Sequence, residues 1–428
     1  MNYLSTRKND EKVSFREAVI NGLTKNSGLY FPENIPSLPV SFFENIESKE
    51  DHAIAFEVLK PFTKGSLNDE QLGQIISETL NFPLPVVKVE DNIFSLELYH
   101  GNTQAFKDVG ARFMSRCLSH FYNDHSQNVT ILVATSGDTG SAVANGFFDV
   151  KGIDVKILFP KGKVSPYQEF QMTTLGKNIQ AIEVEGTFDD CQKLVKEAFN
   201  DTKLREKVTL SSANSINVAR LLPQMLYYFL AYKQLKKQGV LKDKKLIVSV
   251  PSGNLGNVTA GLLAKKIGLP IEHFIAAHNA NDTFYNYLQT GKYEQKPSVQ
   301  TFSNAMDVGN PSNFERIEYL YKSNVEATKK DISAFTVDDE KTIEEIKNCY
   351  DKNSYLLDPH GAVGKLALHD VLKDDEIGLF LETAHPQKFS EIIQKAIPSY
   401  KSEKVDLSNA KKLSIENDYD KLVDIILK

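Results

Sequence analysis

The sequence has few of the features that mark several large protein classes. Its three cysteines, Cys117, Cys191 and Cys349, lie far apart and form no C-x-x-C pair, which argues against a disulfide framework and a zinc knuckle. No run of about 18 apolar residues could cross a bilayer. Residues 1–14 include acidic residues and contain no apolar stretch typical of a targeting peptide. We therefore expect a cytoplasmic protein with no membrane partner.

The chain also lacks an excess of charge of either sign. The formal net charge is -6, from 56 acidic and 50 basic residues, and no basic stripe or long charged run stands out. Nucleic acid is therefore not an expected partner. No H-x-x-x-H or His–Cys grouping is present, so no metal site is predicted.

The sequence has enough apolar residues for a large core. With 428 residues, 41% of them hydrophobic, it can form two or three domains. Short apolar runs rich in branched residues alternate with helical patterns, which is typical of parallel α/β sheets covered by helices on both faces. The predicted strands are residues 129–134, 155–159, 179–185, 245–250, 273–277 and 377–382.

Composition along the chain suggests three parts. Residues 1–90 are predicted to form an N-terminal, mainly helical domain, in which Ser14 and Glu17 form a capping box. Residues 91–400 would form the catalytic region. We expect a helical tail over residues 401–428.

Two segments rich in small residues follow predicted strands. They are ATSGDTGSAVANGFF (134–148) and VPSGNLGNVTAGLLAKKIG (250–268). In each, glycines permit a sharp turn into a helix, whose free N–H groups and positive dipole end suit a phosphate or carboxylate. Neither segment fits G-x-G-x-x-G, and the chain has no G-x-x-x-x-G-K-[ST] motif, which argues against NAD and ATP. The alternative interpretation is that the glycines serve only to make the turn, which would be a sufficient explanation for either loop alone. Two such loops in one chain favour ligand binding.

A third polar cluster lies in SSANSINVARLL (211–222). Asn214, Ser215, Asn217 and Arg220 precede or open a predicted helix. Arginine is suited to binding phosphate through two hydrogen bonds. Helix capping with one surface arginine is the alternative interpretation. Beside two anion loops, the cluster becomes a candidate for a second anion.

Lys107, in HGNTQAFKDVGARF (100–113), lies in the first turn of a predicted helix. One apolar face of this helix carries Phe106, Val109, Phe113, Cys117 and Phe121. A lysine beside that face opposes the helix dipole; a snorkelling or paired side chain is the ordinary explanation. A desolvated amine there would instead have a lowered pKa and be nucleophilic. With an anion loop, such an amine suits pyridoxal phosphate, an aldehyde that carries a phosphate.

Five ordered motifs resemble those of the threonine synthase family in its bacterial and fungal form. They are HGNTQAFKD, ATSGDTGSA, NSINVAR, VPSGNLGN and GLFLETAHP. The resemblance extends from residue 25 to residue 389, most of the chain. It implies an α/β protein of fold type II, the tryptophan synthase β fold, with two lobes of mostly parallel sheets flanked by helices. The small lobe would be inserted at about residues 120–200. Asn102 and Gln104 replace the usual proline and leucine of the lysine motif.

The resemblance also implies a role for each motif. Lys107 would hold pyridoxal 5′-phosphate as a Schiff base, and Thr383 would meet the pyridine nitrogen. The backbone N–H groups that would bind the cofactor phosphate are those of Gly253, Asn254, Leu255, Gly256 and Asn257. The residues that would bind the substrate α-carboxylate are Thr135, Ser136, Asp138 and Thr139. Those that would bind the substrate phosphate are Asn214, Ser215, Asn217 and Arg220.

The implied reaction converts O-phospho-L-homoserine and water into L-threonine and phosphate by γ-elimination and β-addition, with Lys107 as a general base. A serine or threonine dehydratase, or a cysteine synthase, is an alternative within the same fold, and a non-catalytic cofactor-binding relative is another. The phosphate cluster around Arg220 favours the first reaction, because these other enzymes bind no substrate γ-phosphate. The oligomeric state, monomer or dimer, is left open.

Overall fold

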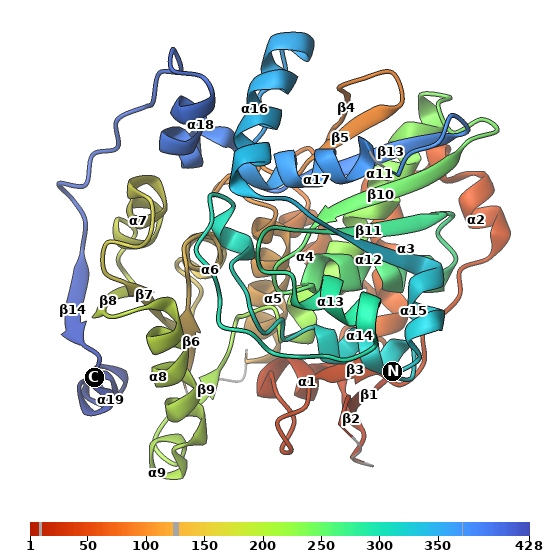
Figure 1. Cartoon of the computed structure of the whole chain (residues 1–428). Helices are drawn as coiled ribbons and strands as arrows, with labels where there is room; N and C mark the ends of the chain where they lie inside the picture. The colour runs from red at the N-terminus through yellow and green to blue at the C-terminus, as the bar shows by residue number, and fades with distance from the viewer. Residues whose placement is uncertain (8–10, 123–127, 370) are drawn as a thin grey trace.

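A computed structural model describes residues 1–7, 11–122, 128–369 and 371–428 (Figure 1). The strands of these residues form three sheets. The sheet of the large lobe has the order β12 (Ile332–Thr336), β11 (His273–His278), β10 (Lys245–Pro251), β13 (Glu376–Glu382), β5 (Ile93–Glu97) and β4 (Val86–Lys88). The sheet of the small lobe has the order β14 (Lys412–Glu416), β8 (Ile179–Glu185), β7 (Ile153–Pro160), β6 (Val129–Ala134) and β9 (Thr209–Ser211). A small antiparallel sheet has the order β2 (Val13–Ser14), β1 (Asn2–Ser5) and β3 (Tyr30–Pro32).

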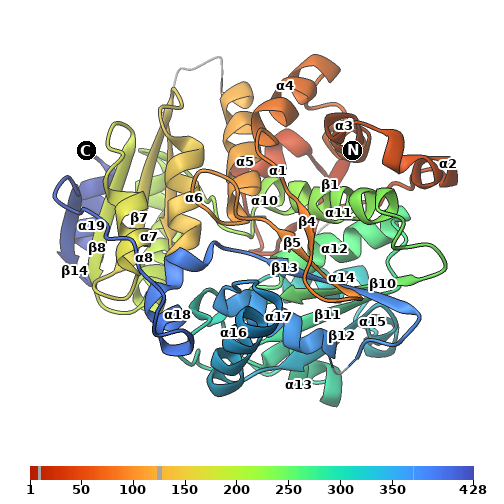
Figure 2. The same cartoon turned by 90° about the horizontal axis from the view of Figure 1, so that it is seen from above.

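Helices cover both large sheets (Figures 1 and 2). In the first half of the chain they are α1 (Phe15–Asn21), α2 (Val40–Glu44), α3 (Asp51–Thr63), α4 (Asp69–Thr79), α5 (Lys107–Phe121), α6 (Asp138–Phe147), α7 (Pro166–Thr173), α8 (Phe188–Asn200) and α9 (Thr202–Arg205). In the second half they are α10 (Val218–Leu221), α11 (Met225–Lys237), α12 (Gly256–Ile267), α13 (Thr283–Thr290), α14 (Phe314–Leu320), α15 (Val325–Asp331), α16 (Asp339–Asn353), α17 (Pro359–His369), α18 (Ser390–Ala396) and α19 (Tyr419–Ile426). Short 3-10 turns are η1 (Ile46–Ser48), η2 (Leu222–Gln224), η3 (Asn304–Met306) and η4 (Pro386–Phe389).

All six predicted strands are confirmed, as β6, β7, β8, β10, β11 and β13. Their apolar runs are buried on both faces because helices cover each side of a parallel sheet. Within the two large sheets, the β4–β5 pair is antiparallel and the other described pairs are parallel. The predicted two-lobed α/β architecture is therefore confirmed.

The two ends of the chain differ from the simple helical interpretation. The N-terminal part contains the sheet β2–β1–β3 as well as helices, and the predicted capping box of Ser14 and Glu17 is present at α1. The tail contains β14, which pairs with β8 and extends the small-lobe sheet, before α19 (Figure 1). These strands are short or half exposed, so they lack the continuous apolar run that marks a buried strand.

The order of strands in the large lobe positions the functional loops. β10, β13 and β5 are neighbours and run parallel, so their carboxyl ends lie at one edge of the sheet. The chain leaves β5 for α5, β10 for α12, and β13 for η4 at this edge. Helix α5 packs against α6 of the small lobe, where a Cβ on Gly146 would lie only 3.0 Å from Ala111. The site therefore lies where the two lobes meet.

Candidate active site

Lys107 is the first residue of α5, in the connection that follows β5. Among the described residues its Nζ has no hydrogen bond or ion pair, and it lies 5.4 Å from the ring centroid of Phe106. Burial lowers the pKa of Lys107 to about 8; Asp138 opposes this shift, and Lys388 and Arg220 add to it. The amine is thus partly desolvated and unpaired, and a larger fraction of it is neutral at physiological pH than for an ordinary lysine.

The helix that begins at Lys107 has the predicted apolar face. Val109, Phe113, Cys117 and Phe121 are buried in the main core, whereas Phe106 precedes the helix and is half-buried. On other faces of α5, Arg112 donates to Asn81 Oδ1, and Arg116 donates to Glu78 at 3.1 Å and to the Gly146 carbonyl at 2.7 Å. Arg116 thus joins α5 to α4 and α6, and Arg112 joins α5 to the segment that follows α4.

The segment between β10 and α12 forms an anion-binding turn. Leu255 adopts a left-handed conformation (φ 57°) at the N-cap of α12 and provides no side-chain cap, so the first N–H groups of α12 are left for a ligand. A Cβ on Gly253 would lie 2.6 Å from the Met306 backbone, so only glycine fits there. Buried Asn257 accepts from Tyr228 at 2.7 Å, while its Nδ2 has no partner among the described residues.

Asn254 and Ser215 connect this turn to the third polar cluster. Asn254 Nδ2 donates to Ser215 Oγ at 2.5 Å, and Asn313 donates to the Asn254 carbonyl at 3.0 Å. The structure therefore places Ser215 against the glycine turn. The resemblance groups Ser215 with Arg220 for the substrate phosphate, and this stays a prediction: its oxygen accepts from Asn254, which leaves its own O–H to donate.

The segment between β6 and α6 offers two free hydroxyl groups. Ser136 and Thr139 are half-buried, and neither side chain has a hydrogen-bond partner in the described part of the chain. Thr135 Oγ1 accepts from the amides of Gly137 and Gly140 at 2.9 and 2.8 Å, so it shapes the loop. Of the side chains predicted to bind a carboxylate, Ser136 and Thr139 are available.

Asp138 does not fit its predicted role, because its carboxylate is already paired. It forms a 2.6 Å ion pair with Lys388 of η4 and accepts from Gln168 Nε2 at 3.0 Å. Burial raises the pKa of Asp138, but Lys388 and Lys107 more than offset this, and the net pKa lies below its usual value. A buried carboxylate would also repel the carboxylate of a substrate.

Arg220 is the charged side chain of the third cluster, and it keeps a free donor that an anion could accept from. It is buried, donates from one guanidinium nitrogen to the Ala213 carbonyl, and leaves Nε without a partner among the described residues. Burial lowers the pKa of Arg220 to about 10. Asn214 Oδ1 is also buried and unpartnered.

Asn217 is used by the fold. Its Oδ1 caps α10 by accepting from Ala219, and its Nδ2 donates to the Val19 and Ser212 carbonyls at 2.9 and 3.3 Å. These contacts attach α1 to the third cluster and leave the side chain with no free N–H for phosphate.

Thr383 lies next to the lysine connection. Its carbonyl accepts from the Phe106 amide at 2.8 Å, and its buried hydroxyl has no hydrogen bond to any described residue. Because β5 and β10 are separated only by β13, their ends lie about 10 Å apart. Lys107 therefore lies beside Thr383, and the turn at residue 255 follows β10, which is the neighbour of β13 in the same sheet.

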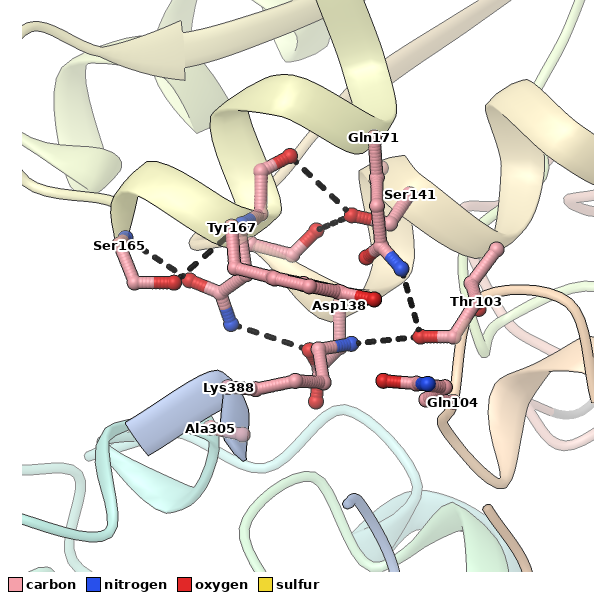
Figure 3. Close-up of polar contacts among 12 residues, drawn as sticks. Thr103, Gln104, Asp138, Ser141, Ser165, Tyr167, Gln171, Ala305 and Lys388 are labelled. Atoms are coloured by element: carbon pink, nitrogen blue, oxygen red, sulfur yellow. Dashed lines mark hydrogen bonds and ion pairs between the residues drawn. The ribbon is translucent and has the colours of Figure 1, made fainter. Parts of the chain in front are cut away.

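The sequence interpretation missed several residues of the site. Figure 3 shows Lys388 between Asp138 and the carbonyl of Thr103, to which it donates at 2.9 Å. Gln168, which donates to Asp138 at 3.0 Å, and Arg316, which donates to the Ser215 carbonyl at 3.1 Å, were also missed. Lys388 lies within TAHPQKF, a motif that was recognised, but neither Gln168 nor Arg316 lies in any recognised motif.

Comparison with known proteins agrees with this site. A family model described as pyridoxal-phosphate dependent enzyme matches residues 79–379, and one described as threonine synthase N terminus matches residues 2–80. Threonine synthase from Haemophilus influenzae is 45% identical over 93% of this chain and 91% of its own length. The chain belongs to the threonine synthase family.

Solved structures of threonine synthases have the same fold. The Escherichia coli enzyme superposes with a TM-score of 0.91 and 39% identity, over 100% of this chain and 99% of its own. A pyridoxal-phosphate-bound threonine synthase from Brucella melitensis superposes with a TM-score of 0.92 and 33% identity over the same shares. The protein is accordingly a fold type II, pyridoxal-phosphate-dependent enzyme.

The residues of this threonine synthase family member fit that cofactor. The uncapped start of α12, the unpartnered Asn257 Nδ2 and the space kept open by Gly253 suit its phosphate. The unpaired Lys107 amine suits its aldehyde. In the described ranges, no group of three or more His, Cys, Asp or Glu residues could hold a metal ion, and no helix is long and apolar enough to cross a membrane.

Proposed function

We propose that the protein is a threonine synthase that converts O-phospho-L-homoserine and water into L-threonine and phosphate. The observation that carries the proposal is that the site contains two separate positions suited to bind an anion and one amine without an ionic partner. The start of α12 offers one position, and the buried, unpartnered Nε of Arg220 offers the other. Both Arg220 and Lys388 are near enough to lower the pKa of Lys107.

Each group has a proposed task. The glycine turn holds the cofactor phosphate, Thr383 faces the pyridine nitrogen, and Arg220 binds the substrate phosphate. Ser136, Thr139 and the start of α6 bind the substrate carboxylate. The bound cofactor supplies an electron-withdrawing system that acidifies the substrate Cα and Cβ protons.

Lys107 moves the protons in this proposal. Its pKa of about 8 lets it accept a proton from Cα near neutral pH and return one later. Arg220 holds the phosphate as it leaves and stabilises its developing negative charge. Burial at the lobe junction limits access of water, so that the one water added at Cβ comes from within the site.

The test is a coupled assay with purified protein, pyridoxal 5′-phosphate and O-phospho-L-homoserine. Equal amounts of phosphate and L-threonine are expected. Lys107→Ala should lower kcat by about 10³-fold or more. Phosphate release without threonine would instead indicate an elimination enzyme, and equal threonine formation by K107A would refute the role of Lys107.

We also propose a cytoplasmic location and a monomeric or dimeric state. The three cysteines are free and buried, which fits a reducing compartment. Sedimentation of the purified protein tests the oligomeric state.

A further inference from the structure

Two carboxylates lie near Lys107, and both are engaged by other groups. Asp108, the next residue, accepts from the Thr103 amide at 2.8 Å and from the Thr103 hydroxyl. Asp138, across the lobe junction, is held by Lys388 and Gln168. Lys107 is therefore left without an anionic partner although two carboxylates are close by.

The Asp138–Lys388 pair is fully enclosed. The side chains of Lys388 and Asp138 are 0% and 3% exposed, and their charged atoms are 2.6 Å apart. Lys388 also donates to the Thr103 carbonyl at 2.9 Å (Figure 3). Since Thr103 in turn holds Asp108, Lys388 is bound directly to Asp138 and connected to Asp108 through Thr103.

The charges that face Lys107 come from four elements. Asp138 of α6 raises the pKa of Lys107, whereas Lys388 of η4 and Arg220 of α10 lower it. Asp108 of α5 is buried and bound to Thr103. From α11, the Tyr227 hydroxyl donates to the Phe106 carbonyl, and burial keeps the pKa of this phenol far above neutral. Lys388 is thus the cation in direct contact with the one carboxylate that raises the pKa of Lys107.

We propose that Lys388 is a positioning residue that occupies the carboxylate of Asp138 and so keeps the Lys107 amine free to react with the cofactor aldehyde. This inference rests on the proposed role of Lys107. The lone pair of a neutral amine bonds to the aldehyde carbon, and water is lost; an amine held as an ammonium ion by Asp138 has no lone pair to offer. The same pairing explains why Lys107, and not the more deeply buried Lys388, is the reactive amine of the pocket.

The experiment measures capture of pyridoxal 5′-phosphate by full-length apoprotein across a series of pH values. The adduct is reduced with borohydride and located by peptide mapping, and the midpoint of capture at Lys107 is read. In Lys388→Met the midpoint should rise by about one to three pH units, because Asp138 then pairs with Lys107. In Asp138→Asn it should fall. In the double variant K388M/D138N, which removes both charges, it should return toward the wild-type value.

A matched control separates this effect from loss of a buried ion pair. Lys365 is 2% exposed and forms ion pairs with Glu345 at 2.7 Å and with Glu90. Neither glutamate is among the charged groups described around Lys107. Lys365→Met should lower stability but leave the midpoint of capture unchanged.

The outcomes are distinguishable. An unchanged midpoint in K388M and D138N, with the adduct still on Lys107, overturns the role of Lys388 alone. An adduct that forms equally well in K107A, or maps to another lysine in the wild type, overturns the proposed function instead.

Discussion

Asn254 donates a 2.5 Å hydrogen bond to Ser215 Oγ and accepts one from the Ser312 amide. These two bonds hold the glycine turn against both the third polar cluster and the segment before α14. Asn254→Ala should weaken cofactor binding by about 10- to 30-fold, because two hydrogen bonds that fix the turn are lost. Fluorescence titration with pyridoxal 5′-phosphate measures this. Asn286→Ala, which removes one helix contact to Asp282, should bind the cofactor normally.

Gly253 approaches the Met306 backbone too closely to carry a side chain. A Cβ would lie 2.6 Å from Met306 Cα and 3.1 Å from the Ala305 carbonyl, and backbone atoms cannot move aside as a flexible side chain can. Gly253→Ala should therefore displace the turn and reduce cofactor affinity at least about tenfold. Gly73→Ala is the control: nothing lies within 4 Å of its Cβ position in α4, and it should be neutral or stabilising by about 1 kcal/mol.

Arg220 should affect substrate phosphate binding more than cofactor capture. Arg220→Met removes a charged donor, which lowers kcat/KM for O-phospho-L-homoserine by about 10- to 150-fold. Cofactor capture at pH 9 should stay near the wild-type level. Arg112→Met removes a buried arginine that contacts Asn81 and should leave kcat/KM within about twofold. Equal losses in both variants would show that Arg220 acts only through folding.

Arg316 is fully buried and donates hydrogen bonds to backbone carbonyl groups. It donates to the Tyr30 carbonyl at 3.1 Å, to the Ser215 carbonyl at 3.1 Å, and to the Ile216 carbonyl. Arg316→Met would leave these acceptors unsatisfied and should lower the free energy of unfolding by about 3–5 kcal/mol in urea denaturation. Arg7→Met removes an exposed ion pair with Glu315 and should cost about 1 kcal/mol or less.

The pKa of Lys107 sets the pH dependence of cofactor capture. Because the neutral amine reacts and its pKa is about 8, the capture rate should rise about tenfold per pH unit below 8 and level off above it. A lysine with the ordinary pKa of about 10.4 would continue to accelerate beyond pH 10. Stopped-flow absorbance of the wild-type apoprotein decides between these profiles.

Local sequence patterns are enough to predict the buried framework and the chemistry of the site. Continuous apolar runs such as residues 129–134 and 377–382 indicate buried strands, and the glycine-rich segments after residues 134 and 250 indicate sharp turns into helices with free N–H groups. Lys107 beside an apolar helix face left two interpretations open, a snorkelling or paired lysine and a desolvated amine, and the neighbouring anion loop favoured the second. These features are local, so a short stretch of sequence contains the physical reason for each.

Which polar side chains are free to bind a ligand depends on contacts between distant parts of the chain. The motifs predict Asp138 and Asn217 as ligands. In the structure, Asp138 pairs with Lys388, and the Asn217 side chain donates to the Val19 and Ser212 carbonyls. The partners in these contacts, Lys388 and Val19, come from segments far away in the chain. The strand β14 likewise has no apolar signal of its own and is defined by pairing with β8. Such choices depend on which groups folding brings within hydrogen-bond distance, and no local pattern encodes that.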